Sequence, residues 1–339
     1  MSEIAVIGGG AWGTALAIVL GRRNAHNVRL WVYESAVRDS IASRRQNELF
    51  LPGFNLPASV HATNSMEEAL AGAQILVSVM PSHHCRGLFQ QMTPFLRPEM
   101  LFVSATKGIE NDSLMRMTQV IAAVLSEHGI REPRLAALSG PSFAVEVARG
   151  DPTAVTAAST DAELACVVQR EFSDPGFRVY TNSDIIGVEL GGALKNIVAI
   201  AAGVCDGLEL GHNTVAALIT RGLAEITRLA LACGARPGTM SGLAGLGDLV
   251  LTCTGGLSRN RSVGVELGRG GKLPGIIAAM HGMVAEGVLT TNAAIGLARR
   301  YSVEMPITTQ MHAILHENKS PKTAIQELMT RPGTTELWA

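Results

Sequence analysis

Hydrophobic positions in the first half of the chain form short runs rich in β-branched residues, separated by longer stretches with helical spacing. Strands are predicted at 4–7, 28–32, 75–80, 101–104, 135–138, 154–157 and 177–180, and helices at 11–22, 66–71 and 113–127. Strands that alternate with helices are typical of βαβ units. The pattern therefore predicts an α/β domain with a doubly wound parallel sheet.

The pattern changes after about residue 185. Segments rich in Ala, Leu and Ile follow at 187–202, 213–233, 261–269, 275–281, 289–300 and 321–331, punctuated by Gly and Pro. Strand-like alternation nearly vanishes, which indicates helices. A chain of 339 residues also exceeds the size at which one hydrophobic core stops growing. We expect an α/β domain at 1–185 and an all-α domain at 186–339, packed around a shared cleft.

A glycine-rich loop separates the first predicted strand from the first helix. Gly8, Gly10 and Gly13 fit the pattern G-x-G-x-x-G, and Glu34 is predicted to close the second strand, about 20 residues further on. Glycines allow a tight turn and the close approach of a pyrophosphate, and the following helix aims its N-terminal N–H groups at the phosphates. This context predicts a Rossmann-type domain that binds a dinucleotide, with a purely structural turn as the alternative.

Two further loops follow predicted strands, where open α/β sheets bind their ligands. Lys107 lies just past the strand at 101–104. Residues 139–144 (S-G-P-S-F-A) follow the strand at 135–138, and their N–H groups and serine hydroxyls can hold a carboxamide or a phosphate. The alternatives are a solvated surface lysine and a plain strand-to-helix turn with Ser142 near the cap.

Lys195 and Asn196 interrupt a predicted helix that is otherwise almost entirely apolar. Desolvation lowers the pKa of a buried lysine, which suits it to proton transfer near neutral pH. The alternative is a lysine that extends its side chain to the surface from a helix end. The position in the middle of the segment favours the functional interpretation.

The segment 245–261 contains the highest density of candidate functional residues. Asp248 lies between glycine and an apolar run, so we expect it to be partly buried and to need a cationic partner. Arg259 and Asn260 precede a helix predicted to start at Arg261. A guanidinium and an amide at a helix N-terminus form a good receptor for phosphate. The alternative is an ordinary loop with a helix cap.

Composition and charge narrow the class of protein. The chain is 47% hydrophobic and 17% charged, and its formal net charge is -1, which gives no general electrostatic reason to expect nucleic acid or an anionic membrane as partner. The first residues lack a basic signal-peptide segment, and Lys195 interrupts the best membrane-span candidate. We expect a cytoplasmic protein with no membrane span.

The five cysteines are widely spaced and form no C-x-x-C pair, so reduced thiols are expected. The segment 82–85 (S-H-H-C) has side chains that can bind metal, but no second ligand cluster accompanies it. Cys253 has no histidine near it in sequence to activate it. We therefore predict neither a metal site nor a cysteine nucleophile.

Taken in order, these clusters resemble the bacterial NAD(P)-dependent glycerol-3-phosphate dehydrogenase family, and the match runs nearly end to end. The matching motifs are the glycine loop with Trp12, N-x-x-F-L-P-G at 47–53, A-T-K-G at 105–108, S-G-P-S-F-A at 139–144, G-G-A-L-K-N at 191–196, G-L-G-D-L at 245–249, S-R-N-R at 258–261 and E-G at 286–287. The resemblance implies a Rossmann-type first domain, an all-helical second domain, and interconversion of dihydroxyacetone phosphate and glycerol 3-phosphate for phospholipid synthesis.

The resemblance also implies residue roles. Lys195 would be the general acid/base on the substrate oxygen, Asp248 would orient it, and Lys107 would contact both the substrate and the nicotinamide end. The implied substrate-binding residues are Lys107, Gly140, Ser142, Lys195, Asn196, Asp248, Ser258, Arg259 and Asn260. The implied cofactor-binding residues are Gly8, Gly10, Ala11, Trp12, Gly13, Tyr33, Lys107, Ala144, Arg259, Val284 and Glu286, with Gly140 also lining the cofactor.

Two departures from the family pattern concern the cofactor. Ala11 stands where a serine often precedes the tryptophan, and Tyr33 stands where a basic residue often follows the second strand. Glu34 favours NAD(H) by accepting from the ribose, whereas the arginines at 38, 44 and 45 offer charge for a 2′-phosphate. The cofactor is therefore expected to be NADP or NAD, with the preference left open.

Two other functions fit parts of the sequence. A β-hydroxyacid or ketopantoate type reductase also pairs a glycine loop with a helical domain that contains a Lys/Asn pair, but the stretch 245–261 is specific to the phosphorylated triose. A non-catalytic redox sensor would bind the dinucleotide without needing Lys195 and Asp248. The sequence leaves the oligomeric state open, and a homodimer is the assembly we consider.

Overall fold

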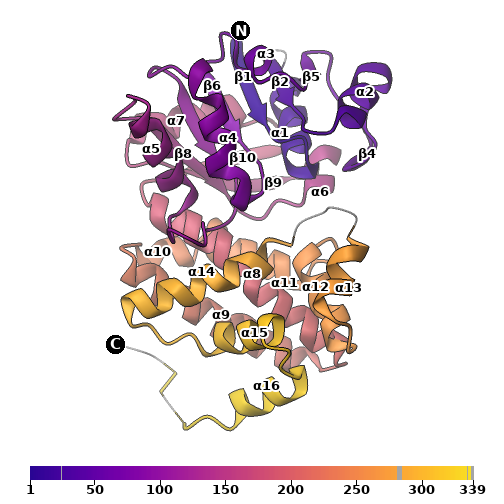
Figure 1. Ribbon diagram of the computed structural model, residues 1–339, viewed down its shortest axis with the longest axis vertical. Helices are drawn as coiled ribbons and strands as arrows, with labels where there is room; N and C mark the ends of the chain where they lie inside the picture. The colour runs from indigo at the N-terminus through magenta and orange to yellow at the C-terminus, as the bar shows by residue number, and fades with distance from the viewer. Residues whose placement is uncertain (24, 281–284, 334, 337–339) are drawn as a thin grey trace.

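In the computed structural model, an α/β part is stacked on a bundle of helices (Figure 1). The structure describes residues 1–23, 25–280, 285–333 and 335–336. Indigo and magenta elements of the first half make up the upper part of Figure 1, and pink to yellow helices of the second half make up the lower part.

Eight strands of the described residues form one sheet in the order β10-β9-β8-β7-β6-β1-β2-β5. They are β1 (Ser2–Ile7), β2 (His26–Trp31), β5 (Val60–Thr63), β6 (Ile75–Ser78), β7 (Leu101–Ser104), β8 (Arg134–Ser139), β9 (Thr153–Ala158) and β10 (Phe177–Asn182). Neighbouring strands are parallel except β8 and β9, which pair antiparallel. The chain leaves β1 toward β2 and later returns on its other side with β6, so the strand order reverses beside β1. Ligands of open α/β sheets bind at such a point.

Helices cover both faces of the sheet, and this explains its near-continuous apolar strands. In β1, Ile4 and Val6 belong to one buried cluster, whereas Ala5 and Ile7 belong to the cluster on the other face. The elements around the sheet are α1 (Ala11–Arg22), α2 (Ser35–Arg44), α3 (Met66–Leu70), α4 (Cys85–Met92), α5 (Met117–Glu127), α6 (Ala144–Arg149), α7 (Ala162–Phe172), the short 3₁₀ helices η1 (Ser82–His84) and η2 (Thr93–Phe95), and a hairpin of β3 (Gln46–Asn47) and β4 (Leu51–Asn55).

The second part is helical. Its elements are α8 (Ile185–Gly207), α9 (His212–Ala232), α10 (Pro237–Met240), the π-helix η3 (Leu243–Gly247), α11 (Asp248–Thr254), α12 (Arg259–Gly268), α13 (Leu273–Ala279), α14 (Glu286–Tyr301), α15 (Pro306–His316) and α16 (Pro321–Met329). Helix α8 packs against α9, α11, α12 and α14, and so forms the centre of the bundle. Asp184 fixes its start by accepting from the Gly187 N–H at 2.8 Å.

One helix of the described residues meets the length and composition criteria for a membrane span. Helix α8 is long and apolar enough to cross a membrane by length and composition, even with Lys195 in it. However, 89% of its most apolar window is buried inside the protein, as expected for the core helix of a bundle.

The predicted fold class is confirmed: a mainly parallel sheet with helices is followed by a helical part. Several boundaries differ from the prediction. The helix predicted from 113 begins at Met117, because Leu114 adopts a left-handed backbone conformation (φ 60°) that ends regular structure there. The helix predicted from Arg261 begins at Arg259, because the hydroxyl of Ser258 caps it by accepting from the Arg261 N–H at 3.2 Å. Strand β2 ends at Trp31, and Glu34 is instead the N-cap residue of α2.

Candidate active site

The glycine loop joins β1 to α1 beside the point where the strand order reverses. A Cβ on Gly13 would lie 1.9 Å from the Gly8 carbonyl oxygen, so the loop and the helix could not pack as they do with another residue at 13. A Cβ on Gly10, by contrast, would meet no described protein atom within 4 Å. The fold thus gives no packing reason for glycine at 10, and the open cradle at the α1 N-terminus fits the close approach of a dinucleotide phosphate.

Three charged side chains meet where the two parts of the molecule touch. Asp248, 1% exposed, accepts from both lysines: its Oδ1 from Lys195 Nζ and its Oδ2 from Lys107 Nζ, the latter at 2.8 Å. Lys107 Nζ also donates to the Gly140 carbonyl at 3.0 Å, and Lys195 Nζ donates to the Thr252 hydroxyl at 2.7 Å. The buried aspartate expected to need a cationic partner thus has two, one from each part of the molecule.

The environment of Lys195 favours loss of its proton. Burial lowers the pKa of its ammonium group to about 8, while Asp248 opposes this shift and Lys107 adds to it. The lysine is therefore charged at neutral pH but can release its proton slightly above it, which is the behaviour of a general acid/base.

Two glycines explain how both partners come so close to Lys195. A Cβ on Gly191 would lie 2.5 Å from the Ala244 carbonyl oxygen in the π-helix that leads directly to Asp248. A Cβ on Gly192 would lie 2.4 Å from the Ser139 hydroxyl and 3.7 Å from a methylene of Lys107. One turn of α8 therefore contacts the segment leading to Asp248 on one side, and the end of β8 and the loop after β7 on the other.

Asn196 and Asn260 form a second polar group one turn further along. Asn260 Nδ2 donates to Asn196 Oδ1 at 3.0 Å, and Asn260 Oδ1 accepts from the Gly287 N–H at 2.9 Å. Both oxygens are thus engaged within the protein, so Asn260 ties α12 to α8 and to the start of α14. Arg259 lines a hollow of about 580 Å³ between α12 and α13, and although the residue as a whole is exposed, burial lowers the pKa of its guanidinium while the charge of Glu286 opposes that shift.

Glu286 links the second part of the molecule back to the first. Its Oε1 accepts from the Ser82 N–H at 3.0 Å and its Oε2 from the Ser82 hydroxyl at 2.6 Å. Burial raises the pKa of Glu286 above its ordinary value, while the bonds from Ser82 and the charge of Arg259 oppose that shift. Ser82 was missed as a site residue, although its position after β6, at the carboxyl edge of the sheet, is a signal that could have found it.

Thr252 was also missed by the sequence analysis. It lies four residues after Asp248 on the same helix, so the two side chains share a face. Its hydroxyl donates to the Asp248 carbonyl at 2.6 Å and accepts from Lys195. The i, i+4 spacing is the signal that could have found it.

The remaining predicted residues lie around these groups. Ser142 donates through its hydroxyl to the Gly140 carbonyl at 2.9 Å, and Ala144 begins α6. Trp12, next to Ala11 in the first turn of α1, packs against Phe177 with ring centroids 6.4 Å apart. Val284 lies outside the described residues.

The side chains considered for cofactor choice are arranged around α2. Tyr33 is 79% exposed. Arg38 pairs with Asp39 at 2.6 Å, Arg44 with Glu48 at 2.5 Å, and Arg45 donates to the carbonyl oxygens of the segment 56–57. The three arginines thus interact with their own neighbours, whereas Tyr33, next to Glu34, remains largely exposed with its ring centroid 6.4 Å from that of Trp31.

Cys253 lies close to the lysine pair but is buried, 1% exposed, and burial raises the pKa of its thiol to about 12. A thiol with such a pKa is a poor nucleophile, in agreement with the prediction that Cys253 does not act as one.

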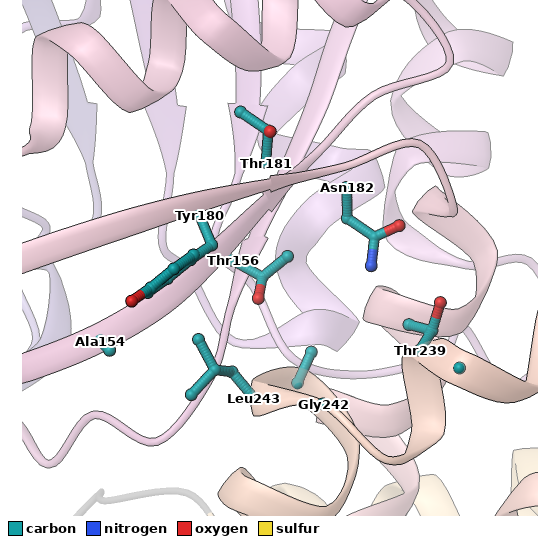
Figure 2. Close-up of a pocket in the computed structure, with 10 residues that line it drawn as sticks. Ala154, Thr156, Tyr180, Thr181, Asn182, Thr239, Gly242 and Leu243 are labelled. Carbon is teal, nitrogen blue, oxygen red and sulfur yellow. The ribbon is translucent and has the colours of Figure 1, made fainter.

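A separate hollow of about 380 Å³ lies at the far edge of the sheet, between β10 and the start of the π-helix (Figure 2). Tyr180, Asn182 and Leu243 line it, and its lining contains none of the candidate residues named above.

A glycine loop for a dinucleotide at a strand-order reversal, facing a buried lysine–aspartate pair from a helical domain, defines a two-domain NAD(P)-dependent oxidoreductase. Family comparison is more specific. Residues 3–165 match the model of the N-terminus, and residues 184–326 that of the C-terminus, of NAD-dependent glycerol-3-phosphate dehydrogenase. The chain belongs to the glycerol-3-phosphate dehydrogenase family, and the resemblance noted from its motifs is confirmed.

Similar proteins cover the whole chain. Glycerol-3-phosphate dehydrogenase [NAD(P)+] of Koribacter versatilis is 70% identical over 338 residues, with 100% of both chains covered, and that of Geobacter sulfurreducens is 56% identical over 339 residues, again with 100% of both covered. The crystal structure of glycerol-3-phosphate dehydrogenase from Coxiella burnetii superposes with a TM-score of 0.92 at 41% identity, covering 97% of this chain and 99% of that one.

A ketopantoate reductase from Ralstonia eutropha is also similar in structure. Its TM-score is 0.62 at 15% identity, with 95% of this chain and 99% of that chain covered. This likeness shows a shared fold alone, and the family match decides against the alternative reductase considered above.

Proposed function

We propose that the lysine–aspartate cluster carries out the proton transfer of a glycerol-3-phosphate dehydrogenase that uses NAD(P). The observation that carries this proposal is the pair of contacts from Lys195 and Lys107 to the two oxygens of buried Asp248. A non-catalytic sensor has no use for a buried charged lysine whose pKa is lowered to about 8.

The nicotinamide supplies or accepts the hydride when it is bound. Lys195, protonated, donates its proton to the carbonyl oxygen of dihydroxyacetone phosphate as the negative charge develops there. Asp248 holds the ammonium group in place, and Lys107 adds positive potential beside it. In the reverse direction, neutral Lys195 takes the proton from the hydroxyl of glycerol 3-phosphate.

Arg259 is the side chain we assign to the substrate phosphate. It is exposed beside an open hollow at the first turn of α12, where the helix dipole also favours an anion. Asn260 supports the site by fixing Asn196 and the start of α14. Ser258, which caps α12, sets the position of that first turn.

Dihydroxyacetone phosphate is expected to drive oxidation of NADH or NADPH by the purified protein, whereas unphosphorylated dihydroxyacetone should be at least about tenfold less efficient, since it forfeits a charge-assisted contact worth about 1.5–3 kcal/mol. The measurement is kcat/KM for both compounds. Equal efficiency would remove Arg259 as the phosphate site, and no oxidation with either would refute the proposed reaction.

The two directions of the reaction are expected to respond oppositely to pH. Reduction requires protonated Lys195, so its kcat/KM should fall as the pH rises through about 8, the pKa of the free enzyme's lysine. Oxidation requires the neutral amine, so its kcat/KM should rise up to about the same pH and then level off. Profiles that run parallel in both directions would assign the proton transfer to another group.

Tyr33→Arg is expected to raise the preference for NADP(H) by roughly tenfold or more, because a guanidinium at this exposed position can pair with the 2′-phosphate. The measurement is the ratio of kcat/KM for the two cofactors before and after the substitution. An unchanged ratio would mean that position 33 does not face the adenosine ribose. In the unsubstituted protein both cofactors should work, since Tyr33 supplies no charge and Glu34 lies beside it.

The setting of the reaction is also part of the proposal. The enzyme would act in the cytoplasm as a homodimer without nucleic acid partners, and its product would enter phospholipid synthesis. The net charge of -1 and the buried position of α8 support an enzyme that acts on a small phosphorylated substrate rather than at a membrane. We keep the domain boundary at 185/186, next to the first residue of α8.

A further inference from the structure

Asn47, the first residue of the motif at 47–53, is buried and bonded to the glycine loop. It is 0% exposed and lies in β3, in the hairpin that follows α2. Its Nδ2 donates to the Gly9 carbonyl at 2.8 Å and to the Thr14 hydroxyl at 2.8 Å. Its Oδ1 accepts from the Phe50 N–H at 3.1 Å, which fixes the orientation of the amide. Every donor and acceptor of this side chain is thus used inside the protein.

These bonds determine the direction of one peptide unit in the loop. In a trans peptide the carbonyl and the following N–H point in opposite directions. Because the Gly9 carbonyl is held toward buried Asn47, the Gly10 N–H points the other way, toward the open cradle where a Cβ on Gly10 would meet nothing. The hydroxyl of Thr14 reinforces this arrangement with its own weaker bond to the Gly9 carbonyl at 3.4 Å.

The hairpin that carries Asn47 is anchored independently of the loop. Ser40 of α2 donates through its hydroxyl to the Gln46 carbonyl at 2.7 Å, and the Leu56 N–H donates to the Arg45 carbonyl at 2.7 Å. The side chains of Gln46 and Asn55 are joined by an exposed bond of 2.8 Å. Asn47 therefore reaches the glycine loop from a support that the loop itself does not build.

We propose that Asn47 is a positioning residue of the dinucleotide site: it holds the Gly9 carbonyl inward and thereby presents the Gly10 N–H to the pyrophosphate of the cofactor. The inference rests on the proposed function, since it assumes that a dinucleotide binds at this loop. It assigns to the motif at 47–53 a role in cofactor affinity and none in the chemical step.

The test compares Asn47→Ala with Leu49→Ala, a neighbour in the same hairpin that is 58% exposed and whose side chain has no hydrogen-bonding group. Loss of the amide leaves the buried Gly9 carbonyl without its main donor, so the dissociation constants of NADH and NADPH should rise about tenfold or more. The KM for the cofactor should rise in parallel, while kcat at saturating cofactor and the KM for dihydroxyacetone phosphate stay within about twofold. Leu49→Ala should leave all of these unchanged.

Fluorescence titration of the reduced cofactors gives the affinities, and thermal unfolding of the free protein gives the stability. A lower Tm with unchanged affinity for both cofactors would make Asn47 merely structural and overturn the inference. Where Asn47→Ala does not fold, Thr14→Val decides: it removes the hydroxyl that orients the amide, and an affinity at least about threefold weaker supports the inference, whereas an unchanged one overturns it. Absence of cofactor binding by the unsubstituted protein would instead refute the proposed function.

Discussion

Replacement of Lys195 by alanine is expected to lower kcat by about 10²–10⁴-fold, the usual contribution of a general acid/base. The lysine is buried next to Asp248 and its pKa is lowered to about 8, so water in the same place would be a far weaker proton donor. The dissociation constants of NADH and NADPH should barely change, because the glycine loop lies in the other domain. Steady-state kinetics and cofactor titration on the same preparation measure both effects.

Two variants control this result. Lys195→Met keeps much of the apolar volume of the lysine stem, and should be as inactive as Lys195→Ala if the amine is what matters. Lys319→Ala removes a partly exposed lysine of the helical domain that pairs with Glu327 at 2.5 Å, and should leave kcat unchanged. Near-normal turnover in either Lys195 variant would rule out its role as the proton donor.

Asp248→Asn is expected to lower kcat/KM for reduction by about 10²–10³-fold and to destabilise the protein, because it leaves two lysines facing each other without their shared carboxylate. Removing one partner of a buried ion pair costs about 3–5 kcal/mol. Asp248 also raises the pKa of Lys195, so without it the fall of kcat/KM for reduction should occur at a lower pH. The pH profile distinguishes this effect from a loss of folded protein.

Asp206→Asn is the matched control, because Asp206 lies on the same helix as Lys195 and pairs with Arg261 at 2.6 Å near the surface. A pair of this kind, whose side chains are 27% and 30% exposed, contributes about 1 kcal/mol or less, so activity and pH profile should be preserved. If kcat/KM for reduction by Asp248→Asn still fell at about pH 8, Asp248 would have no effect on the pKa of Lys195.

The sequence was sufficient to predict elements whose periodicity is strong. Helix α1 and strand β7 have the predicted ends, because Gly10 directly precedes the helix and the apolar run 101–103 makes up most of the strand. Helix α2 was not predicted, since Val37 and Ile41 are its main apolar residues and its pattern is weak. The antiparallel pairing of β8 with β9 also went unpredicted, because strand direction depends on how the chain returns and not on which residues are apolar.

In the candidate site, too, local sequence predicted some features, whereas others depend on how distant segments pack together. Burial of Asp248 and its need for a cation followed from the apolar residues around it, but the choice of two lysines, 53 and 141 residues away, depends on the packing of α8 against the sheet domain. The sequence analysis placed Arg259 and Asn260 together as a phosphate receptor. In the structure Asn260 is engaged with Asn196 and Gly287, which no local pattern indicates.

The contact between Lys107 and Asp248 joins the two domains through groups that we propose act in the proton transfer. A fragment that ended before α8 would keep the glycine loop and Lys107 but lose the carboxylate that neutralises this lysine. The complementary fragment would keep Lys195 and Asp248 but have no cradle for a dinucleotide. Exchange of one domain between relatives therefore has to preserve the fit between these two lysines and one aspartate, so the halves of this enzyme must evolve as a single unit.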